Sequence, residues 1–203
     1  SQGPMLVVVP RTLPVASLKE LLALARAKPG SLNYASAGQG SITHLACAYF
    51  AEMAGLQMTH VPYKGTGPAL TDTIAGQTQL FFSSTATAMP HVQSGALKVL
   101  AVTTAQRLPA LPAIPTIAES GLAAYDVPLW HGMIGPGGLA PAVVERLASE
   151  SRRTLSLKET AEQLAQDGVA PAPPGSPEQF RQRIAAEIGQ WRAVVAKAGI
   201  RIE

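Results

Sequence analysis

The sequence predicts an α/β fold, a mainly parallel sheet flanked by helices, for three reasons. Apolar segments of strand length alternate with segments of helical length along the first half of the chain. Short turns rich in glycine, proline and serine separate them, as is typical of strand–helix units. The composition, 47% hydrophobic and 14% charged over 203 residues, also allows the large core that such a sheet needs.

The expected elements follow one another closely. Residues 5–9 form a β-branched apolar run, typical of a buried strand, and residues 17–27 form an amphipathic helix with Ser17 as its N-cap. The further strands are expected at 32–35, 58–63, 79–82 and 97–103, and the further helices at 42–54, from near Pro68 to Gly76 and from 83–85 to Gly95. Strands joined by helices lie parallel in one sheet.

The pattern changes after residue 104. Residues 107–116 include three prolines and predict an irregular surface segment. A helical turn at 117–121 and a last strand at 127–134 follow. The remaining expected elements are helices: one from Pro141 to about 154, a shorter one ending at Gly168, and one from 177 or 178 to 198.

Charge and cysteine content narrow the function classes. The net charge is +3, and because the Lys and Arg residues are scattered rather than clustered, we expect no nucleic-acid partner. The single cysteine, Cys47, gives no internal disulfide. Cys47 and His44 lie one helical turn apart, but no second close pair accompanies them, so we expect no metal site. No cofactor is expected either.

The stretch at residues 36–41, Ser-Ala-Gly-Gln-Gly-Ser, lies between an expected strand and helix. Such a turn leaves backbone N–H groups unpaired at the positive end of a helix dipole, which favours a carboxylate or a phosphate. We therefore take Ser36, Ala37, Gly38, Gly40 and Ser41 as candidate ligand-binding residues. The alternative is an ordinary strand–helix connection with Ser41 as N-cap.

A second glycine turn follows the strand at 58–63. Tyr63, Lys64 and Gly65 are candidates there because parallel strands end at one sheet edge, where open α/β sheets bind ligands. Lys64 either pairs with a carboxylate or is an exposed loop residue, and we favour a backbone role for this turn.

Three further candidates each have a structural alternative. Ser83 and Ser84 begin a helix, where the alternative to ligand binding is capping. Trp130 lies on the last expected strand, where it either lines the ligand-binding cleft or packs in the core.

Enzyme motifs are absent from the sequence. There is no Gly-x-Ser-x-Gly elbow, no phosphate-binding Gly-x-x-x-x-Gly-Lys-Ser/Thr and no His-Glu-x-x-His. Two alternatives to a binding protein stay open: a small α/β enzyme for an acidic metabolite, with Ser41 and His44 as nucleophile and base, and an isolated lobe with only an interaction role.

Several blocks of the sequence resemble the solute receptors of tripartite tricarboxylate transporters, the Bug family. One of them is His60-Val61-Pro62-Tyr63-Lys64-Gly65. The others are residues 36–41, 44–45, 68–72, 90–91, 100–103, 109–112, 115–116, 119–121 and 130–132. The resemblance runs from about residue 6 to the C-terminus.

This resemblance implies a type II periplasmic-binding-protein fold, with two lobes that close over a small carboxylate. It implies a periplasmic, non-enzymatic receptor whose partners are the membrane components of the transporter. Family members are longer at the N-terminus, so residues 1–125 would be the second lobe. Residues 126–203 would be the return crossing strand and helices that pack on the first lobe. Family members often carry an acidic residue near Ser83 and Ser84, which leaves the solute's identity open.

The predicted C-terminal helices carry apolar faces that would cover the first lobe. They include Phe180, Ile184, Ile188 and Trp191 on the last helix. Apolar side chains of this size are unfavourable in water. We therefore expect these helices either to fold back on the lobe or to associate, most simply as a homodimer that hides Trp191.

Overall fold

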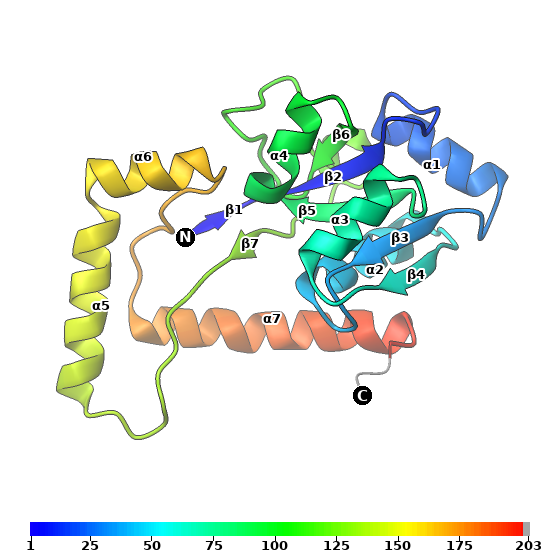
Figure 1. The fold of residues 1–203 in the computed structure, drawn as a ribbon. Coiled ribbons are helices and arrows are strands. Elements are labelled where there is room, and N and C mark those ends of the chain that lie inside the picture. The colour runs from blue at the N-terminus through cyan, green and yellow to red at the C-terminus, as the bar shows by residue number, and fades with distance from the viewer. Residues whose placement is uncertain (201–203) are drawn as a thin grey trace.

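The computed structural model describes residues 1–200, and their centre is a five-stranded sheet (Figure 1). Its strands are β2 (Met5–Pro10), β3 (Asn33–Ser36), β4 (Thr59–Pro62), β5 (Leu80–Ser84) and β6 (Leu97–Val102). Their order across the sheet is β4-β3-β5-β2-β6. These positions confirm the strands expected from the sequence to within one or two residues.

The sheet is mixed because of β2. The pairs β3/β4 and β3/β5 are parallel, whereas β2 is antiparallel to both of its neighbours, β5 and β6. The other four strands therefore share one direction, as a mainly parallel sheet requires. All six residues of β2 are buried. A continuous apolar run predicts this central place but carries no information on direction.

Helices cover both faces of the sheet. On one face lie α1 (Leu18–Ala27) and α2 (Ile42–Ala54), whose apolar side chains pack with Met5, Val7 and Phe82. On the other lie α3 (Thr66–Ile74) and α4 (Thr85–Gln93), which pack with Leu6 and Phe81. Alternate residues of β2 and β5 thus pack into the cores on opposite faces of the sheet, because successive side chains of a strand point to opposite sides.

The segment after β6 confirms one expectation and corrects another. Residues 107–116 are irregular, and a single helical turn, η1 (Ala118–Ser120), follows them. The strand expected at 127–134 is wrong in extent, because only β7 (Leu129–Trp130) is paired. Its partner β1 (Gln2–Gly3), which sequence reasoning missed, is just two residues long, so the ladder ends there.

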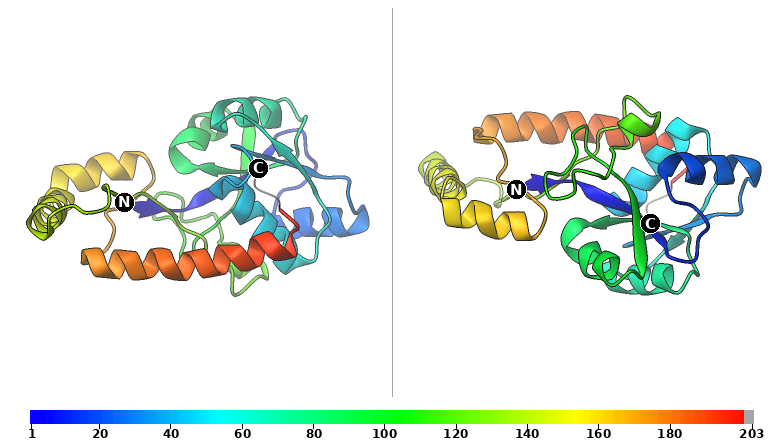
Figure 2. Two further views of the ribbon diagram at one scale, coloured as in Figure 1. Left: turned by 90° about the horizontal axis from the view of Figure 1, so that it is seen from below. Right: turned by 90° about the horizontal axis from the view of Figure 1, so that it is seen from above.

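Two of the C-terminal helices extend away from the sheet, and the third returns to it (Figures 1 and 2). No residue of α5 (Pro141–Leu155) or α6 (Lys158–Gln166) is buried. The long helix α7 (Pro177–Lys197) runs back along α2, where Trp191 packs edge-on against Tyr49 and Val194 is buried. Folding back, one of the two expected outcomes, therefore holds for α7 but not for the apolar side of α5.

Candidate functional site

Three loops with candidate residues lie at one edge of the sheet. They follow β3, β4 and β5, which run in the same direction. Two backbone hydrogen bonds join the first two loops directly: Tyr63 N donates to Ser36 O at 3.0 Å, and Gly65 N donates to Ala37 O at 3.1 Å. The chain also enters at this edge, because Met5 of β2 pairs with Ser84. The structure thus confirms the common edge expected for the three loops.

The loop between β3 and α2 is held by its own hydrogen bonds. The Ala37 amide donates to Thr43 Oγ1 at 2.9 Å, the Gly38 amide to Ser36 Oγ at 3.2 Å, and the Gly40 amide to His44 Nδ1 at 3.1 Å. The expectation of several unpaired N–H groups is therefore wrong for these three. Neighbouring side chains satisfy them, as buried polar groups require.

Ser41 caps helix α2. Its hydroxyl accepts a hydrogen bond from the His44 amide at 3.3 Å, and the Ser41 amide donates to Gly38 O at 3.1 Å. The His44 imidazole instead accepts from Gly40 through Nδ1. The nucleophile–base pair considered from the sequence is therefore not formed by these contacts. The start of α2 still directs its dipole at this loop, which favours an anion there.

The second loop is held by backbone and side-chain contacts. The Gly65 amide bonds to the first loop, and Gly65 has a φ of +107°, a conformation that favours glycine. The Tyr63 hydroxyl donates to Asp72 Oδ2 at 2.8 Å, and burial followed by this bond raises the pKa of Tyr63 to about 12. The Lys64 side chain is exposed. The backbone role favoured for this turn agrees with these contacts.

Ser83 and Ser84 are both engaged locally. Ser83 is fully buried, and its hydroxyl donates to Ser84 O at 3.3 Å. Ser84 is the N-cap of α4 and accepts from the Thr87 amide at 3.4 Å. The capping alternative therefore accounts for Ser84. The next residue, Thr85, donates to Pro4 O at 3.3 Å and so ties the start of α4 to the entering chain.

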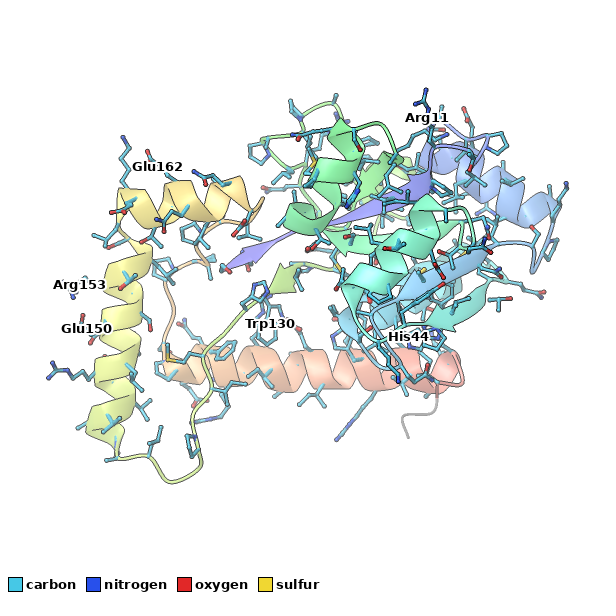
Figure 3. The ribbon with its side chains drawn as sticks, viewed as in Figure 1. Arg11, His44, Trp130, Glu150, Arg153 and Glu162 are labelled. Atoms are coloured by element: carbon cyan, nitrogen blue, oxygen red, sulfur yellow. The ribbon has the colours of Figure 1, made fainter. Side chains whose placement is uncertain are left out.

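Trp130 lies beside α7 rather than in the sheet core (Figure 3). Its indole N–H donates to the Glu187 carboxylate, with distances of 2.8 and 3.0 Å to the two oxygens. Phe180 meets the ring edge-on, and the Arg183 guanidinium lies 5.3 Å from the ring centre. Trp130 and Gly40 line one open hollow of about 330 Å³ between α2 and α7. Trp130 and Gly40 of the first loop therefore border the same hollow.

Sequence reasoning missed a pair of stacked imidazoles behind the first loop. The rings of His44 and His60 lie 3.6 Å apart and within 6° of parallel, and Tyr34 stacks on His60 at 5.0 Å. His60 Nε2 lies 2.6 Å from Ser36 Oγ. Because His60 belongs to β4 and His44 to α2, only the spatial pairing of β4 with β3 brings them together.

The surroundings of both imidazoles favour the neutral form. Burial lowers the pKa of His44. Burial, and then the charge that His44 would carry, lowers the pKa of His60 to about 4. Since His44 Nδ1 accepts the Gly40 hydrogen bond, this nitrogen carries no proton. At neutral pH the pair is therefore uncharged.

Two other kinds of site were searched for among residues 1–200. No group of three or more His, Cys, Asp or Glu side chains there is arranged to hold a metal ion. Cys47 is buried in the core, and burial raises its thiol pKa well above the ordinary value. No helix in the same range is long and apolar enough to cross a membrane.

Comparison with known families gives one match over nearly the whole chain. The model described as "Tripartite tricarboxylate transporter family receptor" matches residues 1–200. A UPF0065 protein from Pseudomonas sp. (strain P51) is 35% identical over 96% of this chain and 58% of its own length. Protein BugT of Bordetella pertussis is 31% identical over 98% of this chain and 61% of its own length. The chain thus spans about three fifths of these relatives.

Solved structures give the same picture. An R. palustris protein with adipate superposes with a TM-score of 0.91 and 34% identity, over 98% of this chain and 67% of its own. The periplasmic binding protein BugD superposes with a TM-score of 0.87 and 30% identity, over 100% of this chain and 68% of its own. MatC of Rhodopseudomonas palustris, with bound malate, superposes with a TM-score of 0.85 and 28% identity, over 96% of this chain and 67% of its own.

Proposed function

The chain belongs to the receptor family of tripartite tricarboxylate transporters, and we propose that it serves in a periplasmic receptor that captures a small carboxylate. The observation that carries the proposal is its superposition, over 98% of its length, on an R. palustris protein solved with adipate. Family members and structural neighbours are binding proteins of transporters, not enzymes. The membrane components of such a transporter are the proposed partners.

Within this receptor, we propose that residues 1–125 form one ligand-binding lobe and that residues 126–203 return from it. The antiparallel pair β1/β7 supports this division, because it lies where the chain enters and leaves the sheet (Figure 1). Apolar side chains beyond that point are half exposed: Val143 at 45%, Leu147 at 44% and Ile188 at 46%. We propose that a further lobe covers them or, failing that, a second copy of this chain in a homodimer.

The proposed ligand site is the sheet edge at the start of α2. We assign it to Ser36, Ala37, Gly38, Gly40 and Ser41, together with the backbone of 63–65, the hydroxyls of Ser83 and Ser84, and Trp130 across the hollow. The helix dipole and the close glycine backbone support a carboxylate here. Because loop amides already have partners, we expect the ligand to share these amides as a second acceptor, with bonds such as that from Gly40 to His44 kept in place.

A thermal-shift screen with adipate, malate and related mono- and dicarboxylates tests the proposal. A ligand that binds only the native state stabilises it by about 2.7 kcal/mol at a hundredfold excess over Kd. We expect at least one dicarboxylate to raise the melting temperature and to bind saturably in calorimetry without being consumed. Turnover of a ligand would contradict the receptor assignment, and no shift with any carboxylate would contradict binding by this chain.

Two glycine variants locate the site. Gly40 and Gly30 have nearly the same φ, +74° and +76°, but Gly30 precedes β3 and so lies at the opposite sheet edge. Both Gly40→Val and Gly30→Val therefore bear similar backbone strain. We expect Gly40→Val alone to weaken carboxylate binding, by more than about tenfold, because its branched side chain blocks close approach to the loop. Equal affinities for the two variants would exclude this loop as the site.

A further inference from the structure

The stacked pair of His44 and His60 offers a function beyond packing, because each ring contacts the proposed anion-binding loop. His44 Nδ1 accepts the Gly40 amide at 3.1 Å, and His60 Nε2 lies 2.6 Å from Ser36 Oγ. The loop is thus attached to the pair near both of its ends. The two rings, 3.6 Å apart, also hold each other in place.

We propose that His44, braced by His60, positions the loop of residues 36–41 for ligand binding, and that protonation of the pair in acid releases the loop and the ligand. This inference rests on the proposed function, since it concerns the regulation of that same site. Both histidines are positioning residues here. The contacts that position the loop are those of His44 with the Gly40 amide and of His60 with the Ser36 hydroxyl.

The geometry explains why the pair must stay neutral. A proton on His44 Nδ1 would turn an acceptor into a donor that faces the Gly40 N–H, so the hydrogen bond would be lost. A proton on His60 would leave its contact with Ser36 intact, since a protonated imidazole still donates. It would, however, place a positive charge against the stacked His44 ring. Of the two, the proton on His44 is therefore the one that breaks a contact of the loop.

The groups around the pair supply no compensating negative charge. Tyr34 on β3 and Cys47 on α2 are neutral, because burial raises the pKa of each. Glu52, further along α2, pairs with Lys197 of α7, and Asp72 of α3 accepts from Tyr63. In the part of the chain that the structure describes, no ion pair includes either imidazole.

The remaining charged groups near the loop are already matched or exposed. Glu187 of α7 lines the hollow shared with Gly40, but it pairs with Arg183 and accepts from Trp130. Arg192 of α7 and Lys64 after β4 are exposed cations. In the absence of ligand, an additional positive charge on the pair would thus gain no partner among these groups.

The experiment compares the pH dependence of ligand affinity in the chain and in His44→Asn/His60→Gln. Asn Oδ1 and Gln Nε2 are as many bonds from Cβ as the nitrogens they replace, so hydrogen bonding is kept without a titrating ring. Each protein is compared with its own affinity for the best dicarboxylate of the screen at pH 7.5. From pH 7.5 to 4, the chain should lose about tenfold more affinity than the double variant, the cost of about one hydrogen bond.

The ligand's own protonation affects both proteins equally and cancels in this comparison. His91→Gln, which alters a histidine on α4, is the matched control and should keep the chain's pH profile. Parallel profiles for the chain and the double variant would overturn the inference, and so would tighter binding of the chain in acid.

A measurement without ligand separates this inference from the proposed function. We expect the amide NMR signal of Gly40 to shift with pH together with the His44 ring signals, and to be independent of pH in the double variant. A Gly40 amide signal that does not shift while the His44 ring titrates would overturn the inference even if carboxylates bind. If no carboxylate binds but the signals move together, the loop attachment holds and the proposed function fails.

Discussion

The contact of Gly168 with Thr85 holds the returning segment against the sheet edge, and a single methyl group tests it. Gly168 follows α6 and has a φ of +70°. A Cβ at this position would lie 2.2 Å from Cγ2 and 2.5 Å from Cβ of Thr85, the first residue of α4. Since real Cβ atoms do not approach so closely, Gly168→Ala must shift the backbone on one side of the contact.

The cost has two parts, and a control separates them. A non-glycine residue in the left-handed region costs about 1–2 kcal/mol, and overpacking adds about 1–3 kcal/mol, so we expect a total loss of about 2–5 kcal/mol. Gly55 has a similar φ of +63° but nothing within 4 Å of its added Cβ. Gly55→Ala should therefore show the first part alone.

Urea unfolding of both variants measures the difference in the free energy of unfolding. Adding Thr85→Ser to Gly168→Ala removes Cγ2, the nearer of the two atoms, and should recover part of the loss. If Gly168→Ala and Gly55→Ala lose the same stability, and Thr85→Ser recovers nothing, then α6 does not end against α4 as the structure has it.

Three further predictions concern stability and association. Because the pKa of His60 is lowered to about 4, its contribution to stability should be complete above about pH 6.5 and should be lost as pH falls toward 4; a melting temperature constant from pH 7 to 4.5 would contradict this. Lys98 donates to the carbonyls of Leu13 and Val15, so Lys98→Met should cost about 1–3 kcal/mol in urea unfolding, whereas no loss would show that these bonds are dispensable. We expect light scattering to show association at high concentration, and Trp191 to fluoresce at a wavelength typical of a buried indole. A monomer whose Trp191 emits as a solvent-exposed indole would contradict both folding back and dimerisation.

The sequence alone determined the strands of the main sheet and the helices, because their signals are local. Ser17 and Ser41 cap helices as expected, and Gly55 ends α2 in the left-handed conformation. Each signal depends on residues a few positions apart. The family resemblance then indicated a receptor of tripartite tricarboxylate transporters, and the family match over residues 1–200 confirmed membership of that family.

Only the tertiary structure decided the direction of β2, the pairing of β1 with β7 and the state of the candidate site. Strand direction depends on which neighbours a strand meets, and β2 pairs with β5 and β6, which come far later in the chain. Likewise, the amide of Gly40 is satisfied by His44, which in turn stacks on His60 from another strand. Glycine spacing predicts where an anion site can form, but hydrogen-bond partners from distant segments determine which of its donors are occupied, because burial requires every polar group to find one.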